Sequence, residues 1–197
     1  MDERRAKAGR PRDARVDAAL LHAAVDVFME RGYSRASLSE VARRAGVGTP
    51  AIYRRWPTKA AVAMDIVEHE SRTDAMPDSG SIRDDLVAFL RLRLRTWSSP
   101  LFSQVLIPVV MEASSDARLA EAIRQRFVEY RQPNVEARIH SAIAAGELRP
   151  DTDPSRLINL LMGTVTMPLL FSQDLPQASD VPLIVDQVLD GFAARDA

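Results

Sequence analysis

The chain has 197 residues, 46% of them hydrophobic and 27% charged, which suits one sizeable domain or two small ones and excludes disordered and collagen-like classes. It contains no cysteine, which excludes disulfide frameworks, thiolate metal sites and cysteine nucleophiles and suits a reducing compartment. The net charge is only −1, but residues 1–60 hold 13 Arg or Lys against 7 Asp or Glu, so the first third is basic and the remainder is acidic.

A basic N-terminal third on an acidic body indicates a surface for a polyanion such as nucleic acid, with a chance fluctuation in charge as the alternative. Residues 1–15 are charged and no apolar stretch follows them, so they do not resemble a secretory signal. The longest apolar stretch, 157–171, has 15 residues and contains Asn159, Gly163 and Pro168. A membrane span needs about 20 apolar residues. We therefore expect a soluble, cytoplasmic protein with no membrane partner.

Apolar residues recur at spacings of three and four through nearly all of the chain, which predicts an all-α fold of about nine helices. The first half is predicted to hold four helices, at 13–31, 37–46, 49–56 and 58–73. Residues 76–80, with the sequence Met-Pro-Asp-Ser-Gly, are typical of a linker. We therefore predict two domains, at 13–76 and 81–197.

Capping signals predict where these helices begin and end. Gly32 ends the first helical run, as a left-handed cap does, and the second run stops at Gly46. Ser37 and Glu40 match a capping box, in which each side chain is expected to bind the backbone amide of the other. Thr49, followed by proline, is expected to cap the third helix, and Thr58 is expected to cap the fourth.

The second half is predicted to hold five helices, at 82–97, 100–113 and 117–145, from Asp153-Pro154 onward, and at 181–194. Pro108 is expected to kink the helix at 100–113, and Pro133 is expected to kink or interrupt the helix at 117–145. Proline has this effect because it removes a backbone hydrogen bond and its ring clashes with the preceding turn.

Residues 37–56 match the requirements of a helix-turn-helix, which needs a small residue facing its partner helix, a glycine at the turn and an apolar anchor on the second helix. Ala42, Gly46 and Ile52 meet these requirements in that order. The outward positions of the same stretch carry arginines and hydroxyl groups, which are side chains that contact phosphates and bases. The sequence therefore predicts a DNA-binding head.

At these residues the chain resembles the tetracycline-repressor (TetR) family of bacterial regulators. The matching residues, in chain order, are Gly32-Tyr33, Ser37-Leu38, Val41-Ala42, Ala45-Gly46-Val47, Ile52-Tyr53, Trp56 and Lys59. The resemblance implies a three-helix DNA-binding head with a helical body that binds a small-molecule effector and forms a homodimer. It further implies a repressor that binds a pseudo-palindromic double-stranded DNA operator and leaves it when a small, largely apolar effector binds.

The resemblance also implies that Ser37 and Lys59 hold phosphates, while the start of the third helix faces base edges in the major groove. Ile52 and Trp56 lie one turn apart and are expected to be buried, which leaves the opposite face for DNA. Tyr53 is expected to contact a phosphate, with a packing aromatic as the alternative. The predicted DNA-binding residues are Ser37, Arg43, Thr49, Pro50, Ala51, Tyr53, Arg54, Arg55 and Lys59. Five basic residues between 4 and 12 form either a minor-groove arm or a solvated tail.

Arg93 lies near the middle of the apolar arc of the predicted helix at 82–97, where a charged side chain must be paired or must face a cavity. One alternative is a structural ion pair with a carboxylate such as Glu112 or Glu129, and the other is recognition of an anionic or polar ligand. Nearby aromatic residues and methionines are either plain core or pocket lining. The predicted ligand-binding residues are Phe89, Arg93, Trp97, Phe102, Leu106, Phe127, Tyr130, Met162 and Met167.

The helix that opens at Asp153-Pro154 is apolar almost all round, so one side faces the core and the other side is left for a second surface. Together with the helix at 181–194 it is predicted to form a two-fold dimer interface, as the family resemblance also implies. The predicted interface residues are Leu157, Leu161, Val165, Val185 and Val188.

Two other functions compete with this interpretation. Residues 46–51 match the G-x-G-x-x-A dinucleotide fingerprint of some enzymes, but that fingerprint follows a strand, whereas here it follows a predicted helix. His22, His69 and His140 lack metal-ligand spacing, so we expect neither a metal nor a cofactor, and we do not expect an enzyme. A helical protein-binding adaptor is the second alternative, which the salt dependence of DNA binding would distinguish.

Overall fold

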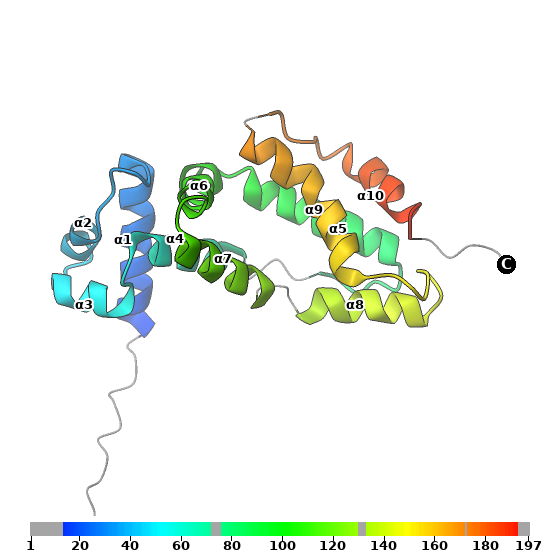
Figure 1. Ribbon diagram of the computed structural model, residues 1–197, viewed down its shortest axis with the longest axis horizontal. Coiled ribbons are helices and arrows are strands. Elements are labelled where there is room, and N and C mark those ends of the chain that lie inside the picture. The colour runs from blue at the N-terminus through cyan, green and yellow to red at the C-terminus, as the bar shows by residue number, and fades with distance from the viewer. Residues whose placement is uncertain (1–13, 72–75, 130–132, 172, 193–197) are drawn as a thin grey trace, which may run out of the picture.

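The computed structural model describes residues 14–71, 76–129, 133–171 and 173–192, which form ten α-helices and one π-helical turn (Figure 1). The all-α prediction is therefore confirmed, with one α-helix more than expected. None of the described helices is long and apolar enough to cross a membrane.

Four helices form a head at one end of the molecule (Figure 1): α1 (Ala14–Arg31), α2 (Leu38–Arg44), α3 (Thr49–Arg55) and α4 (Lys59–Ser71). Helix α1 packs against α2 and α4, and α2 packs against α3. Their apolar faces meet in one hydrophobic cluster, the head cluster, whose largest fully buried members are Trp56, Phe28, Ile52, Ile66 and Val27.

The turn between α2 and α3 is built around Gly46, whose φ of +69° is in the left-handed region that glycine adopts without strain. The Val47 amide donates to the Ala42 carbonyl at 3.0 Å, which is the bond of a Schellman motif. Helix α3 then begins at Thr49, with Gly48 in the N-cap position and no side-chain cap. The predicted cap by Thr49 is therefore wrong, because Gly48 still has the extended backbone of an N-cap, with φ −71° and ψ 142°, and Thr49 is already helical.

The other predicted caps can be followed through their hydrogen bonds. Ser37 Oγ accepts from the Glu40 amide at 3.2 Å, and Thr58 Oγ1 accepts from the Ala61 amide at 3.1 Å. The Glu40 carboxylate lies 3.4 Å from Arg31 Nε, so it pairs with α1 rather than returning to the Ser37 amide. Half of the predicted capping box is thus present.

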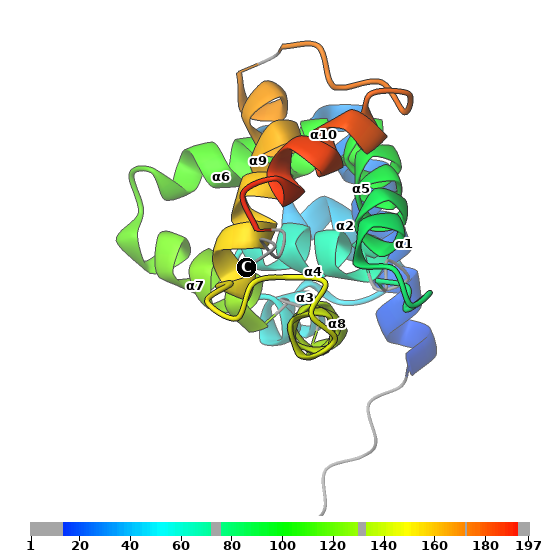
Figure 2. The ribbon, with the colours of Figure 1, turned by 90° about the vertical axis from the view of Figure 1, so that its right-hand side faces the viewer.

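The remaining elements form the body: α5 (Ile82–Trp97), the π-turn η1 (Phe102–Leu106), α6 (Ile107–Ala113), α7 (Ala117–Glu129), α8 (Pro133–Ala144), α9 (Pro154–Leu170) and α10 (Val181–Leu189). Helix α5 packs against α8, α9 and α10, and both views show α10 beside α5 and α9 (Figures 1 and 2). A second hydrophobic cluster, the body cluster, has Leu86, Leu90, Ile139, Leu157 and Leu161 among its fully buried members.

The prolines shape the body largely as predicted. The π-helical turn η1 directly precedes α6, and Pro108 lies in the first turn of α6. Proline has no backbone N–H to continue the hydrogen bonds of the preceding turn. Pro133 opens α8, so the predicted helix at 117–145 is two helices, which accounts for the extra element. The last helix ends at Leu189 rather than at 194, because the Phe192 amide turns back to the Leu189 carbonyl at 2.7 Å.

The head and body share elements at their junction. Val62 and Ile66 of α4 belong to the head cluster, whereas Val67 of the same helix belongs to the body cluster. In the other direction, Val105 of η1 and Val109 of α6 are fully buried in the head cluster. Helices α4 and α6 therefore connect the two clusters directly.

A buried ion network holds the start of α5 against α8. Arg138 Nε lies 2.6 Å from Asp85 Oδ2, and the guanidinium also lies 3.3 Å from Glu147 Oε1. The Ser79 amide donates to Asp85 Oδ1 at 2.9 Å, and the Ile82 amide donates to Glu147 Oε2 at 2.7 Å. Burial alone would raise the pKa of Asp85, but the hydrogen bonds from Ser79 and Arg138 lower it below its ordinary value.

Candidate DNA-binding interface

Helix α3 is anchored by the two residues that the sequence predicted to be buried. Ile52 is fully buried and Trp56 is 2% exposed, both in the head cluster. Trp56 Nε1 donates to Asp65 Oδ2 of α4 at 2.6 Å, so α3 is fastened to α4 by a polar bond as well as by packing. The outer face of α3 is thereby held in a fixed direction.

That outer face carries polar side chains that are open to a partner. Thr49, Pro50 and Arg54 are exposed, Tyr53 is 48% exposed and Ala51 is half-buried. The exposed residues offer a hydroxyl, a guanidinium and a phenol, all of which bind bases or phosphates. They all lie on the first two turns of α3.

Arg55 differs from its neighbour Arg54. Its guanidinium carbon lies 4.7 Å from the centre of the Trp56 ring, and the residue is half-buried. This cation–π contact packs Arg55 onto the helix anchor, whereas Arg54 extends into solvent. The direct DNA contact predicted for Arg55 therefore has less geometric support than the one predicted for Arg54.

Three of the predicted residues lie outside α3. Ser37, at the N-cap of α2, and Arg43 are both exposed. Lys59 Nζ donates to the Ser34 carbonyl at 3.1 Å and lies 4.4 Å from the centre of the Tyr33 ring. The ammonium group of Lys59 is thus positioned by the connection between α1 and α2.

Tyr33 links this surface to the body, a role that the sequence did not reveal. Its hydroxyl donates to Glu112 Oε2 of α6 at 2.9 Å, and the residue is only 3% exposed. Burial, followed by the hydrogen bond to the Glu112 carboxylate, raises the pKa of Tyr33 well above its ordinary value. The Tyr33 ring therefore contacts Lys59 on one side of the head, while its hydroxyl is bound to the body.

The predicted ligand-binding residues fall into three groups. Phe89, Arg93 and Trp97 of α5 and Phe102 and Leu106 of η1 are all buried beside or within the body cluster, and Met162 packs against it. Met167 is 53% exposed on α9, so the prediction that it lines the interior is wrong. The side chain of Phe127 and all of Tyr130 lie outside the described residues.

Four of the five predicted dimer residues are part of the core of the chain itself. Leu157, Leu161, Val165 and Val185 are at most 1% exposed, so their predicted contact with a second copy is wrong. Val188 is half-buried against the same cluster. The large apolar residues exposed on or next to α9 and α10 are Leu160 (53%), Met167 (53%), Phe171 (66%) and Leu183 (61%).

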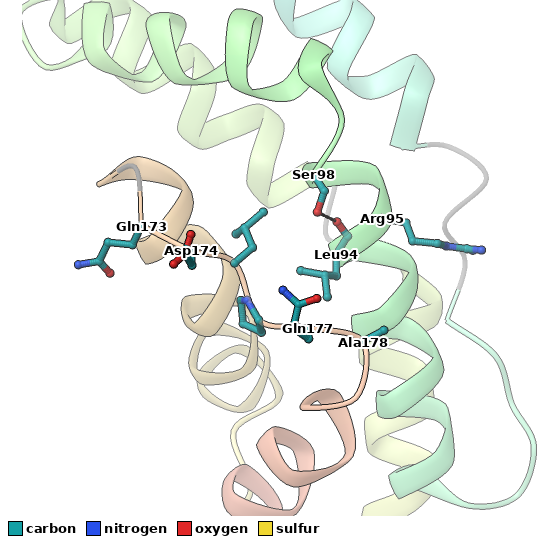
Figure 3. A pocket seen from close by; sticks show the side chains of 9 residues that line it. Leu94, Arg95, Ser98, Gln173, Asp174, Gln177 and Ala178 are labelled. Atoms are coloured by element: carbon teal, nitrogen blue, oxygen red, sulfur yellow. Dashed lines mark hydrogen bonds between the residues drawn. The ribbon is translucent and has the colours of Figure 1, made fainter.

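A groove of about 760 Å³ lies between the last turn of α5 and the connection from α9 to α10 (Figure 3). Leu94 and Arg95 of α5 line it together with Ser98, which directly follows this helix, and residues 173–178 line it from the connection. Arg95 and Gln173 extend to opposite sides of it (Figure 3). Of the predicted ligand-binding residues whose side chains the structure describes, none lines this groove.

The rival sequence motifs can now be placed in the fold. Residues 46–51 form the turn between α2 and the start of α3, so a helix precedes the G-x-G-x-x-A match and a dinucleotide-binding strand does not. Among the described residues, no three His, Asp or Glu side chains are grouped so that they could hold a metal ion.

The comparisons with known proteins agree with this geometry. A model of bacterial regulatory proteins of the tetR family matches residues 20–65, and a tetracyclin repressor-like C-terminal domain matches residues 76–188. The chain is 32% identical to the HTH-type transcriptional regulator YdeS of Bacillus subtilis, over 97% of this chain and 96% of that one. It is 29% identical to the DNA-binding transcriptional repressor TetR of Mycobacteroides abscessus, over 87% of this chain and 90% of that one. The crystal structure of the TetR family transcription regulator SCO0332 matches with a TM-score of 0.76 and 32% identity, covering 89% of this chain and 97% of that one. The chain therefore belongs to the TetR family of helix-turn-helix transcriptional regulators.

Proposed function

We propose that the protein is a cytoplasmic, homodimeric repressor that binds a pseudo-palindromic operator through α3 and releases it when a small, largely apolar effector binds the body. The observation that carries this proposal is the division of α3 into a buried side, Ile52 and Trp56, and an exposed polar patch around Arg54. In this scheme residues 13–76 are the DNA-binding head and residues 81–197 are the effector-binding and dimerisation body. The proposed activity of the protein is the regulation of transcription and not catalysis.

The proposed contacts divide into base recognition and phosphate binding. Thr49, Pro50, Ala51 and Arg54 face base edges, because they lie on the first two turns of a helix whose opposite side is anchored. The phosphate contacts come from side chains around α3, namely Ser37, Arg43, Tyr53 and Lys59, with Arg55 as an outer contact.

The test compares two substitutions at the interface with one on the body. Arg54→Ala is expected to weaken binding to the cognate operator by about 1–3 kcal/mol and to reduce discrimination against other sequences. Lys59→Ala is expected to weaken binding to every sequence alike and to make the salt dependence less steep. Arg91, exposed on α5, provides the control Arg91→Ala, which leaves both quantities unchanged.

The operator for this test comes from footprinting on the DNA upstream of the protein's own coding sequence. Gel shifts in which Arg54→Ala and Lys59→Ala both bind like the parent would refute the proposed interface. Binding to DNA that does not weaken steeply with salt would favour a protein-binding adaptor instead.

The proposed dimer uses the exposed sides of α9 and α10. Leu160 and Met167 are seven residues apart and lie on one side of α9, with Gly163 and Thr164 between them. Small residues in such a stripe allow a second helix to approach closely, and Leu183 extends the apolar surface onto α10. A two-fold axis through this surface pairs identical stripes and holds the two heads about one DNA turn apart.

Charge on this surface tests the dimer. Leu160→Glu and Leu183→Glu are each expected to yield monomers in analytical ultracentrifugation at micromolar concentration. Met111, which is 59% exposed on α6, provides the matched control Met111→Glu, which stays dimeric. A parent protein that sediments as a monomer would rule out the dimer. The expectation of a two-fold symmetric operator, which follows from the dimer, would then fail as well.

The coupling between effector and DNA is proposed to run through the shared helices α4 and α6. Val105 and Val109 are buried in the head cluster, and Tyr33 is bonded to Glu112, so a shift of α6 acts on the head directly. Weakening the operator complex tenfold requires about 1.4 kcal/mol of difference in effector affinity between the two arrangements. A few buried apolar contacts supply that amount.

A further inference from the structure

Tyr33 is a single side chain that contacts both the DNA-binding head and the body. Its hydroxyl donates to Glu112 Oε2 of α6 at 2.9 Å, while the centre of its ring lies 4.4 Å from Lys59 Nζ. The Phe28 ring packs edge-on against it, with the centroids 5.8 Å apart and an angle of 73° between the planes. Because an aromatic ring is rigid, a shift at the hydroxyl end of Tyr33 also moves the part of the ring that contacts Lys59.

The ammonium group of Lys59 is held by two neighbouring residues of the connection between α1 and α2. Its Nζ donates to the Ser34 carbonyl at 3.1 Å, and the Tyr33 ring adds a cation–π contact. An ammonium group has three N–H donors, so donors remain for a phosphate oxygen. Ordering a long, flexible side chain at an interface costs free energy. A ring that orders the ammonium group before DNA binds therefore strengthens a phosphate contact.

Helix α3 is held differently, by contacts within the head. Trp56 Nε1 donates to Asp65 Oδ2 of α4 at 2.6 Å, and Ile52 packs in the head cluster. Tyr33, in contrast, is bonded directly to a residue of the body. A displacement of Glu112 therefore reaches Lys59 through one side chain, while the contacts that anchor α3 stay in place.

We propose that Tyr33 is a positioning residue for Lys59, and that its bond to Glu112 lets the body adjust the phosphate contact without changing which bases α3 reads. The body then changes the affinity for every DNA sequence by the same factor. This inference rests on the proposed function only in taking Lys59 as a phosphate contact and α3 as the helix that reads bases.

The placement of Lys59 is measured first, by NMR on the full-length protein with ¹³C-labelled lysine. The sequence contains two lysines, Lys7 and Lys59, and Lys7→Arg assigns their signals. Ring currents shift protons above an aromatic face upfield, so the Lys59 ε-protons are expected upfield of those of Lys7. Tyr33→Leu is expected to remove this shift, whereas Tyr33→Phe keeps the ring and is expected to retain part of it.

Substitutions of Glu112 test the link to the body, and they keep the proposal falsifiable if Tyr33→Leu fails to fold. Glu112→Ala removes the acceptor of the Tyr33 hydroxyl and is expected to move the Lys59 signal part of the way towards that of Tyr33→Leu. Glu112→Gln retains an acceptor oxygen and is expected to restore the signal of the parent. Both variants change an exposed residue of α6, so both are expected to fold.

DNA binding then measures what this placement contributes. Tyr33→Leu is expected to weaken binding to the operator and to a scrambled duplex of the same length by the same factor, about threefold, which is typical of a surface cation–π contact. In a Lys59→Ala background the same substitution is expected to have no further effect. Asp153→Ala, which removes a cap of α9, is the control that lowers stability and leaves both affinities unchanged.

The outcomes separate this inference from the proposed function. A Lys59 signal that stays in place in Tyr33→Leu and in Glu112→Ala would overturn the inference, while operator binding through α3 would stand. A loss of affinity for the operator alone, or an equal loss in the Lys59→Ala background, would overturn it as well. If Lys59→Ala binds both duplexes like the parent, the phosphate contact of the proposed function fails, and the NMR signals still decide whether Tyr33 positions Lys59.

Discussion

Replacing Arg138 with methionine tests the buried ion network at the start of α5. Methionine has a similar length but no charge, so Asp85, whose side chain is fully buried, would lose the cation that lies 2.6 Å from its carboxylate. Removing one partner of a buried ion pair costs about 3–5 kcal/mol, since the other charge stays buried. We expect Arg138→Met to lower the free energy of unfolding at pH 7 by about this amount.

The pH dependence of this loss gives a second, sharper expectation. In the parent protein the folded-state pKa of Asp85 is lowered, so its contribution to stability is present above the unfolded pKa of about 3.9 and is lost as the pH falls through the folded value. Without Arg138, only the hydrogen bond from Ser79 opposes the effect of burial on the Asp85 carboxylate, so the folded-state pKa of Asp85 is expected to rise. The variant then protonates Asp85 at a higher pH than the parent, so the difference in stability between the two proteins shrinks on acidification.

Urea denaturation followed by circular dichroism at several pH values measures both effects. Arg124→Met serves as the control, since Arg124 pairs with Glu121 on the exposed side of α7, and it is expected to change stability little. Asp85→Asn completes a double-mutant cycle, and the double variant is expected to be more stable than the sum of the two single losses implies. Equal losses for Arg138→Met and the control, or a loss that stays constant down to pH 3, would refute the reasoning.

Three further substitutions test local features of the fold by thermal or urea unfolding. Gly46→Ala is expected to destabilise the head by about 1–2 kcal/mol, because the φ of +69° strains any other residue, and an unchanged melting curve would contradict this. The Asp153 carboxylate accepts a hydrogen bond from the Ser155 amide, at 2.9 Å, at the start of α9. Asp153→Ala removes this cap and is expected to lower the free energy of unfolding by about 1 kcal/mol, whereas unchanged stability would mean that water caps the helix equally well. Tyr33→Phe is expected to cost about 1 kcal/mol, the net worth of its hydrogen bond to Glu112, because the exposed Glu112 carboxylate is hydrated in the variant. The cost is expected to be smaller in a Glu112→Gln background, whereas additive effects would show that the 2.9 Å bond is not formed in solution.

The helices and most of their ends could be predicted because those signals are local. Ser37 and Thr58 each bind an amide three residues ahead, and Gly46 ends α2 through its own backbone conformation. The cap of α3 was misplaced by one residue because Gly48 leaves no side-chain signal, so the neighbouring hydroxyl of Thr49 took its place in the prediction. Local patterns thus identify an element more reliably than its first residue.

The dimer residues could not be predicted for a different reason. Helix α9 is apolar almost all round, so its sequence does not distinguish the side that packs on α5 from the side that is exposed. Leu161 and Leu160 are adjacent and chemically identical, yet the first is fully buried and the second is 53% exposed. Only the arrangement of α5, α8 and α10 around the helix decides between them.

The polar links between distant parts of the chain were also beyond the sequence. Tyr33 and Glu112 are 79 residues apart, and Asp85 and Arg138 are 53 apart, so no spacing rule connects them. From the sequence alone, Glu112 is only a candidate partner for Arg93, because a buried charge requires a partner but does not identify it. Such pairs become visible only when packing has brought the helices together.

The same packing explains how a small change in the body can reach the DNA-binding face. Phe102 and Val105 belong to one π-turn, but Phe102 packs in the body cluster and Val105 packs in the head cluster. A shift of the turn that changes the packing of Phe102 would therefore also change the packing of Val105. Full burial of a valine side chain stabilises a fold by about 1.5–3 kcal/mol, so exposing Val105 even in part would cost an appreciable share of that. That cost is comparable with the 1.4 kcal/mol that a tenfold change in operator affinity requires. Because α6 continues directly from this turn to Glu112, the same displacement would also pull on Tyr33 and loosen its contact with Lys59.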